Sequence, residues 1–354
     1  MSERPHVPSP APSLPRTAGF VIVDKPLGWT SHDVVARMRR LAGTRKVGHA
    51  GTLDPAASGV LVLGVEKATK LLTWVTGTSK TYEATIRLGA ATVTDDAEGD
   101  VTERADASTL AGVSDSDIQR EVSALTGEIQ QVPSAVSAIK VNGKRSYARV
   151  RGGEDVELAA RPVTIHEFTV HDISRDETGI DVTATVSCSS GTYIRALARD
   201  MGRGLGVGGH LTALRRTRVG SFTLDQAHTL DDLTQSVSDG GTVDTLEINR
   251  AAELLFPVRR LDAGEATGLS HGRRISAHPA ELIEGTDLPV ACFAPNGTLV
   301  ALAENRGSAA KRYAASVLGI TAGETFSSDS AGPSDASDAS DAFEPSNSSE
   351  RENH

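Results

Sequence analysis

A short glycine-rich segment combines a carboxylate, two basic residues and flexible backbone. Such a combination could bind a bulky ligand and carry out chemistry on it. The segment runs Lys46-Val-Gly-His-Ala-Gly-Thr-Leu-Asp54-Pro-Ala-Ala-Ser-Gly-Val-Leu61. Its glycines allow tight or left-handed backbone and a close approach to a ligand, and Pro55 fixes the chain directly after the acid. Asp54, near Lys46 and His49, can be an attacking carboxylate. It can equally be an Asx-turn residue that caps its own loop, which is the commoner fate of an Asp before Pro.

This segment resembles the active-site motif of the bacterial tRNA pseudouridine synthase B family, in which the Asp of Gly-Thr-Leu-Asp-Pro is catalytic. Other family segments recur in the same order, so the resemblance covers about residues 19 to 255. It implies a stand-alone enzyme, without guide RNA, that isomerises the T-loop uridine conventionally numbered 55. The reaction cuts the C1′–N1 bond, turns the base and rejoins it through C5. No cofactor and no metal are expected, and the partner is the T-arm stem-loop of tRNA.

Two more residues complete the catalytic set that the resemblance implies. Arg195, in Gly191-Thr-Tyr-Ile-Arg195, matches the arginine that pairs with the catalytic Asp, and a guanidinium can hold a carboxylate by two parallel hydrogen bonds. Tyr82 matches the aromatic that packs on the target uracil, where stacking is worth about 1–3 kcal/mol. Without the resemblance, Arg195 would be interpreted as a surface residue and Tyr82 as a core residue. Three routes are open to Asp54: attack on C1′, attack on C6 of uracil, or removal of a ribose proton to form a glycal.

The remaining matches concern RNA and the uracil pocket. His49 matches a histidine that fills the gap left by the flipped base, which would offset part of the few kcal/mol that unstacking costs. Tyr193 and Leu214 match pocket residues, Lys25-Pro26 matches a pair near the RNA, and Lys80 matches a basic residue close to the active centre. Phosphate contacts, which add affinity without reading sequence, are expected from residues 140–151 and 215–218. The RNA-binding candidates are Lys25, Pro26, His49, Lys80, Tyr193, Leu214, Arg215, Arg216, Lys140 and Arg145.

The net charge of −10 argues against nucleic-acid binding until its distribution is considered. From Glu324 onward eight acids stand against Arg351, so this tail carries −7 and leaves −3 on the rest. Residues 34–50 and 129–153 each hold five Lys or Arg and no acid, and residues 201–224 hold four and no acid. Such stretches are usually solvated faces, but three of them beside family motifs favour a basic groove on an acidic surface.

At 354 residues the chain can form one large and one small domain. Residues 1–18 are proline-rich and are predicted to be a disordered leader. Residues 19–255 mix strands and helices without a regular βαβ rhythm, which favours an α+β catalytic domain with a mixed sheet. Residues 256–322 predict a small β-rich domain that loosely resembles the family's PUA-like RNA-binding domain. Residues 323–354, with Ser/Asp/Ala repeats, predict a disordered acidic tail.

Local patterns predict individual elements. Alternating apolar residues predict half-buried strands over residues 81–88 and 180–188. Thr30 or Ser31 can cap a helix that Gly43 closes. Other predicted elements are strands over 20–23 and 60–63, helices over 67–75, 116–125 and 264–275, a helix start near Tyr193, and a hairpin turn at 295–297.

Other readings of the chain remain open. A tRNA chaperone would use the same RNA surface but has no need of the Asp54–Arg195 pair. A hydrolase would pair Asp54 with Asp95 or Asp96, although these two acids read as loop residues. The G-x-G-x-x-G match at 204–209 follows a predicted helix instead of a strand, so it lacks the geometry of a dinucleotide site.

Two departures from the family pattern bear on local geometry. The family usually shows Pro-Pro where this chain has Pro133-Ser134, and an aromatic where it has Val136.

The two cysteines, Cys188 and Cys292, form no Cys-x-x-Cys, and no apolar run approaches a membrane span. We therefore expect a cytoplasmic, monomeric protein with buried thiols.

Overall fold

The computed structural model describes residues 18–134, 140–141, 144–145 and 158–327. They form two compact units that divide between Phe256 and Pro257. Each unit combines a sheet with helices, and the predicted α+β class is confirmed. Residues 1–17 and 328–354, which include most of the predicted leader and tail, lie outside the described residues.

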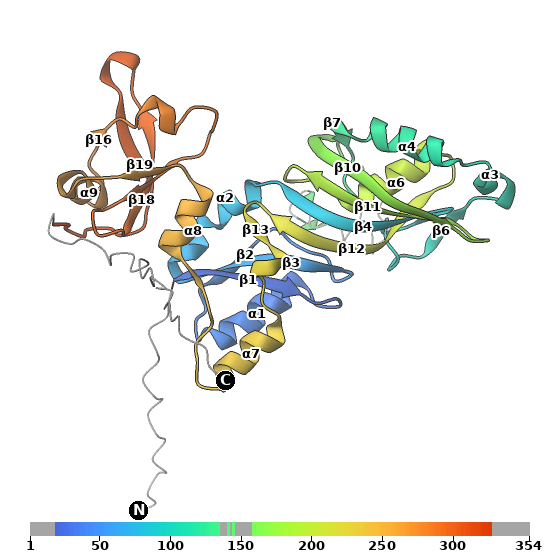
Figure 1. Ribbon diagram of the computed structural model, residues 1–354, viewed down its shortest axis with the longest axis horizontal. Coiled ribbons are helices and arrows are strands. Elements are labelled where there is room, and N and C mark those ends of the chain that lie inside the picture. Colours follow the sequence, from blue (N-terminus) through green and yellow to red (C-terminus); the bar gives the residue numbers. More distant parts are fainter. Residues whose placement is uncertain (1–17, 135–139, 142–143, 146–157, 328–354) are drawn as a thin grey trace, which may run out of the picture. The chain divides into compact units, whose positions relative to one another are not determined.

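A ten-stranded mixed sheet forms the body of the first unit (Figure 1). Its strands are β1 (Gly19–Lys25), β2 (Val47–Ala50), β3 (Ala57–Val65), β4 (Lys80–Leu88), β7 (Gly127–Gln131), β10 (Arg161–Arg175), β11 (Ile180–Cys188), β12 (Gly209–Val219), β13 (Phe222–Thr223) and β14 (Leu246–Glu247). The main order is β14-β1-β3-β12-β4-β11-β10-β7, with β2 beside β3 and β13 beside β12. Only the β3–β12 pair is parallel among the strand pairs described in this sheet.

The predicted alternating strands are confirmed as β4 and β11, which are antiparallel neighbours. In β4 the side chains of Tyr82, Ala84, Ile86 and Leu88 are buried, and those between them are less buried. The apolar side chains of both strands share one hydrophobic cluster. A period of two therefore identified the core face of the strands that carry Tyr82.

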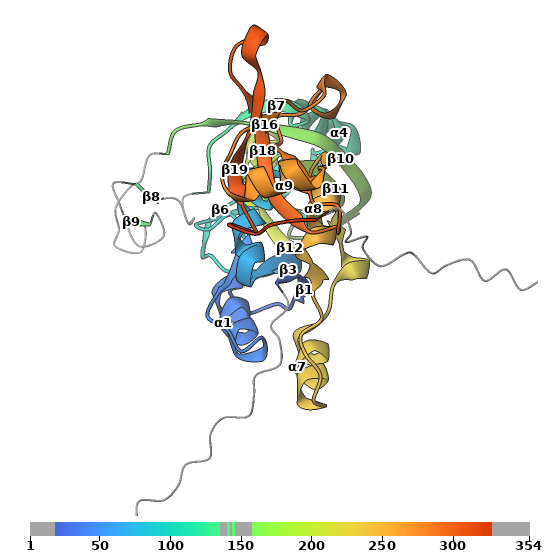
Figure 2. The ribbon, with the colours of Figure 1, turned by 90° about the vertical axis from the view of Figure 1, so that its left-hand side faces the viewer.

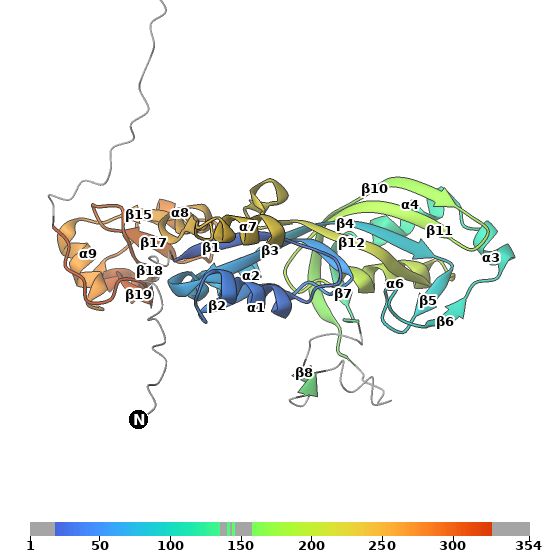
Figure 3. The same ribbon diagram turned by 90° about the horizontal axis from the view of Figure 1, so that it is seen from below.

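Helices cover different parts of the sheet. Thr30 caps α1 (Ser31–Leu41) through a capping box with Asp33, as expected from the sequence. α1 packs with α7 (Leu230–Ser238) against β1 and β3 in one cluster of buried residues. Figures 1 and 2 both place the two helices on one side of these strands, and Figure 3 looks onto that side from below.

The other helices of the first unit include the one that carries Arg195. α6 (Ile194–Gly204) starts directly after Tyr193, as predicted, and packs with α4 (Asp115–Ala124) on the β4–β11 core. The predicted helix over 67–75 is split into a 3₁₀ turn, η1 (Glu66–Leu71), and α2 (Leu72–Gly77). The remaining elements are β5 (Ala90–Thr92), β6 (Val101–Arg104), α3 (Ala107–Ala111), β8 (Lys140–Val141), β9 (Lys144–Arg145), η2 (Leu224–Gln226) and α8 (Ile248–Leu255).

The second unit has its own five-stranded sheet. Its elements are β15 (Val258–Arg260), α9 (Ala263–Ser270), β16 (Ile275–Ser276), η3 (Ala280–Leu282), β17 (Val290–Phe293), β18 (Leu299–Arg306), η4 (Ala309–Lys311) and β19 (Tyr313–Gly319). The strand order is β15-β17-β18-β19-β16. The predicted hairpin turn joins β17 to β18. Phe326 packs in the core of this unit, so ordered chain continues past the predicted boundary at residue 322.

Candidate active site

Two glycines with positive φ flank Asp54. Gly51, with φ of +83°, lies in the turn from β2 to β3, and Gly59, with φ of +103°, lies in β3 itself. A Cβ at Gly59 would lie 2.1 Å from the carbonyl oxygen of Arg216. Only glycine therefore lets β3 approach β12 this closely. The Ala57 amide donates to the Asp54 carbonyl at 3.0 Å, which closes the turn around the acid.

The structure brings Asp54 and Arg195 together. Arg195 Nη2 lies 3.0 Å from Asp54 Oδ2, and the exposed fractions of the two side chains are 8% for Arg195 and 43% for Asp54. Arg195 stands on the first turn of α6, whereas Asp54 comes from the opposite half of the sheet. A buried guanidinium thus orients a carboxylate whose outer part faces solvent, which leaves the acid accessible to a substrate.

A second carboxylate, which the sequence had suggested was only a loop residue, also meets Arg195. Nη1 of Arg195 lies 3.4 Å from Asp96 Oδ2 and donates to the Thr94 carbonyl at 2.7 Å. The guanidinium therefore contacts Asp54 on one side and the Thr94–Asp96 turn on the other. Asp96 also receives the Thr94 hydroxyl and the Glu98 amide. Nothing in its local sequence distinguished it from an ordinary turn acid.

Asp54 and Arg195 line a cavity of about 260 Å³. This lies below the range of about 300–1,000 Å³ that is typical of drug-sized ligands, so it suits a single base with part of its sugar. Tyr82, Tyr193 and Leu214 line it, as expected, and Lys80 and Arg216 complete its wall. Burial raises the pKa of the Tyr82 hydroxyl, so its ring presents a neutral, largely apolar surface.

Comparisons with known proteins agree with this geometry. Three family models match the chain: TruB family pseudouridylate synthase (N terminal domain) over residues 39–194, tRNA pseudouridylate synthase B C-terminal domain over 195–260, and tRNA Pseudouridine synthase II, C terminal, over 256–315. A tRNA pseudouridine synthase B from Paenarthrobacter aurescens (strain TC1) is 63% identical over 302 residues, 83% of this chain and 93% of the relative. The chain belongs to the TruB family.

Further similarities fit this membership. A tRNA pseudouridine synthase B from Thermobifida fusca (strain YX) is 57% identical over 297 residues, which are 83% of this chain and 96% of the relative. A solved Cbf5-Nop10-Gar1 complex contains a chain with 26% identity and a TM-score of 0.60, covering 85% of this chain and 84% of that one. The family predicted from the sequence is therefore confirmed.

Two lysines near the Asp54 turn, Lys25 and Lys80, are buried. Lys25 is completely buried, and its Nζ donates to the carbonyls of Pro26 at 2.9 Å and Trp29 at 2.7 Å. Lys80 Nζ donates to the Thr76 and Thr78 carbonyls. Burial lowers the pKa of each lysine to about 8. Lys25 therefore holds the 26–29 turn from inside, which corrects the expectation of a direct RNA contact, while Pro26 is exposed.

Arg215 and Arg216 are neighbours on β12 with opposite environments. Arg216 is 1% exposed, and its guanidinium donates to the carbonyls of Val60, Gly51 and Thr52. It therefore holds the backbone on both sides of Asp54 from inside the protein, which corrects its interpretation as a phosphate contact. Arg215 is 39% exposed and pairs with Asp24 at 2.7 Å, so it can still meet a phosphate.

His49 lies in β2, not in a loop, and its ring meets His32 edge-on with centroids 5.7 Å apart. Burial, followed by the neighbouring His32, lowers the pKa of His49. The neutral imidazole favoured by this environment suits insertion between bases.

Lys140 and Arg145 pair across the β8–β9 ladder, and Val136 lies outside the described residues.

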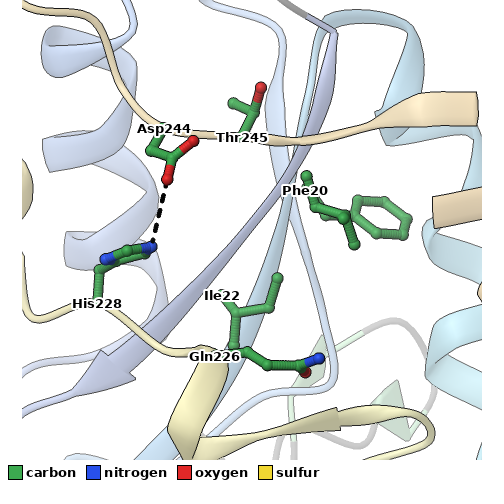
Figure 4. Close-up of a pocket in the computed structure, with 7 residues that line it drawn as sticks. Phe20, Ile22, Gln226, His228, Asp244 and Thr245 are labelled. Atoms are coloured by element: carbon green, nitrogen blue, oxygen red, sulfur yellow. Dashed lines mark ion pairs between the residues drawn. The ribbon is translucent and has the colours of Figure 1, made fainter. Parts of the chain in front are cut away.

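The other candidates for sites are weaker. The glycine-rich stretch at 204–209 follows α6 and leads into β12, so the strand-to-helix geometry of a dinucleotide site is missing there. A separate cavity of about 280 Å³ has Phe20 and Ile22 in its wall, and Figure 4 draws the residues that line it. Its ion pair, His228–Asp244 at 3.8 Å, is largely solvent-exposed, and no predicted site residue lines it. Within the described part of the chain, no helix is long and apolar enough to cross a membrane.

Proposed function

We propose that this protein is a stand-alone tRNA pseudouridine synthase that isomerises the T-loop uridine at position 55 after flipping it into the Asp54 cavity. The Asp54–Arg195 pair inside a base-sized cavity carries the proposal. The names of its curated relatives, tRNA pseudouridine synthase B, support the same substrate class. We further propose that it acts as a cytoplasmic monomer.

Each lining residue has a task in this reaction. Asp54 is the catalytic carboxylate, and Arg195 fixes its direction from the buried side. Tyr82 and Leu214 hold the loose uracil while it turns, and stacking on an aromatic ring contributes about 1–3 kcal/mol per base. His49 would fill the space that the flipped base vacates. The phosphate contacts fall to exposed cations such as Arg215, because Lys25 and Arg216 are used inside the protein.

The hydrolase reading is less well supported. A carboxylate pair requires a second acid that faces the substrate. Asp96 is only 10% exposed and turns toward Arg195, and Asp95 pairs with Arg199. Both acids are paired with arginines of α6 and neither lines the 260 Å³ cavity, so Asp54 is the acid that this cavity exposes.

The proposal is tested by tritium release from T-arm stem-loop RNA labelled at uridine C5, because C5 loses its hydrogen when the new bond forms. Wild type should release tritium, and Asp54→Asn should not, while its RNA affinity stays within about twofold in filter binding. Asp244→Asn is a matched control, because this aspartate is 79% exposed and belongs to the other cavity. Tight binding without release by wild type would instead indicate a tRNA chaperone.

A further inference from the structure

Behind the Asp54–Arg195 pair lies a second guanidinium–carboxylate pair. Arg199 stands one helical turn after Arg195 on α6, so both side chains leave the same face of the helix. Arg199 Nη1 lies 3.3 Å from Asp95 Oδ2. Consecutive acids of one turn are therefore held by consecutive turns of one helix: Asp96 by Arg195, and Asp95 by Arg199.

Asp95 adopts an unfavourable backbone conformation, which the contact with Arg199 helps to stabilise. Its φ is +59°, a backbone conformation that residues other than glycine rarely adopt. Conformations of this kind cost on the order of 1–3 kcal/mol and persist where the surroundings enforce them. The residue is 8% exposed, and its carbonyl accepts from the Leu211 amide at 3.0 Å. The strained residue thus lies between the two residues that contact Arg195, which are Thr94 and Asp96.

Ser134 joins this arrangement from another segment. It is fully buried, and its hydroxyl donates to the Thr94 carbonyl at 3.2 Å and accepts from Arg195 Nη1 at 3.4 Å. Its hydroxyl also interacts with the Asp95 carboxylate, and burial raises the pKa of that acid against the pull of Ser134 and Arg199.

Arg199 also fixes the segment that carries Ser134. Its Nη2 donates to the Val132 carbonyl at 2.7 Å. One guanidinium therefore ties α6 to the Asp95 turn and to the chain that leads into Ser134. The Thr94 carbonyl, beside Asp95, receives both Arg195 and Ser134.

We propose that Arg199, Asp95 and Ser134 form a positioning layer that fixes the Arg195 guanidinium, and through it the Asp54 carboxylate. The layer touches neither the substrate nor Asp54. It acts by holding the Thr94–Asp96 turn in the shape from which Thr94 and Asp96 orient Arg195. The inference rests on the proposed function, because the orientation matters only if Asp54 performs the chemistry.

The first test measures single-turnover tritium release and RNA affinity for Arg199→Gln and Asp95→Asn. Both should lower the rate by about 10- to 100-fold, because misplacing a reacting group by about 1 Å can cost on the order of 100-fold. The dissociation constant of the T-arm RNA should stay within about twofold. Arg175→Gln is the control, because Arg175 likewise joins a carboxylate, Asp115, to a backbone carbonyl, that of Val113, and does not line the cavity. This control should keep the wild-type rate.

The second test asks whether the layer acts through Arg195. In an Arg195→Lys background, Arg199→Gln should reduce the residual rate by less than about twofold, since coupled residues are not additive. A merely structural role would instead lower the rate by the same factor in both backgrounds. Ser134→Ala removes one hydroxyl and serves if Arg199→Gln folds poorly; it should show a smaller rate loss that also vanishes in the Arg195→Lys background.

The two proposals fail in different ways. Wild-type rates in Arg199→Gln, Asp95→Asn and Ser134→Ala would overturn the positioning layer while leaving the synthase intact. Equal losses with and without Arg195 would overturn it as well. Absence of tritium release from wild type would overturn the proposed function itself.

Discussion

Ser31 and Leu53 exchange two hydrogen bonds across 22 residues of sequence. The Leu53 amide donates to Ser31 Oγ at 2.9 Å, and the hydroxyl donates back to the Leu53 carbonyl at 3.0 Å. Both residues are buried. Because Leu53 directly precedes Asp54, the first residue of α1 holds the backbone from which the proposed catalytic acid extends.

Ser31→Ala should therefore reduce the rate as well as the stability. Removing the hydroxyl leaves a buried amide and carbonyl unpaired, which costs about 1–3 kcal/mol for each group, and it frees the Asp54 turn to shift. Thr30→Ala is the matched control, because loss of this helix cap costs about 1 kcal/mol without touching Leu53. Urea unfolding and single-turnover tritium release should show both variants destabilised, with only Ser31→Ala slowed, by about tenfold. Equal rates in the two variants would contradict a role for Ser31 in holding the turn.

Arg195→Lys should lose most activity while keeping RNA affinity. A lysine carries one donor group, whereas Arg195 spans Asp54 Oδ2 on one side and the Thr94 carbonyl with Asp96 on the other. An ammonium cannot reproduce that fork, so Asp54 should lose its fixed direction. We expect a rate loss on the order of 100-fold or more in single-turnover tritium release. Near-normal rates would mean that charge alone, and not the fork, supports Asp54.

The sequence predicted the elements whose patterns are local. The alternation in residues 81–88 and 180–188 exposes one face of each strand, so the period of two is visible. The sequence offered Thr30 or Ser31 as the cap of α1, and in the structure Thr30 is the cap, with Asp33 completing a capping box. β12 was not predicted as a strand, because Arg215, Arg216 and Arg218 interrupt its apolar pattern. Its register also shifts at two places along β4, which breaks the simple alternation.

The resemblance located Asp54 and Arg195, but burial could not be inferred from residue type. Arg216 was interpreted as a surface cation, whereas three carbonyls of the β2–β3 region receive its guanidinium. Those acceptors are some 156 to 165 residues away in sequence, so no local pattern marks them. Asp96 was missed for the same reason, since only the fold brings Arg195 to it.

Substitutions of the neighbours Arg215 and Arg216 should have different effects: one on RNA binding and the other on the stability of the fold. Arg216→Lys should lower the free energy of unfolding by on the order of 3 kcal/mol, because hydrogen bonds from charged donors contribute about 1.5–3 kcal/mol each. Arg215→Gln should change stability by less than about 1 kcal/mol. It should instead weaken RNA binding and reduce the slope of log affinity against log salt by about 1 if Arg215 meets a phosphate. Urea unfolding and filter binding at several salt concentrations measure both, and an unchanged salt slope would remove Arg215 from the interface.

The single-turnover rate should fall as the pH rises through about 8, because Lys80 loses its proton there. Burial lowers the pKa of this lysine from 10.5 to about 8, so the Lys80 side chain in the cavity wall is cationic below pH 8 and neutral above it. If the cation helps to hold the RNA or the developing charge on uracil, the single-turnover rate at subsaturating RNA falls as the pH rises through 8. Lys80→Arg keeps its charge and should abolish this descending limb of the pH–rate profile, whereas Lys80→Met should be slow at every pH.

Unfolding cannot explain such a limb through Lys80. Because its folded pKa lies below its unfolded value, the unfolded chain binds more protons between pH 8 and 10.5, and this group makes the folded protein more stable as the pH rises through that window. The same sign holds for Lys25, whose pKa is also lowered to about 8 but which does not line the cavity. Rates and urea unfolding measured together from pH 6 to 10 therefore distinguish the cause. A limb that persists in Lys80→Arg would assign the titration to a group other than Lys80.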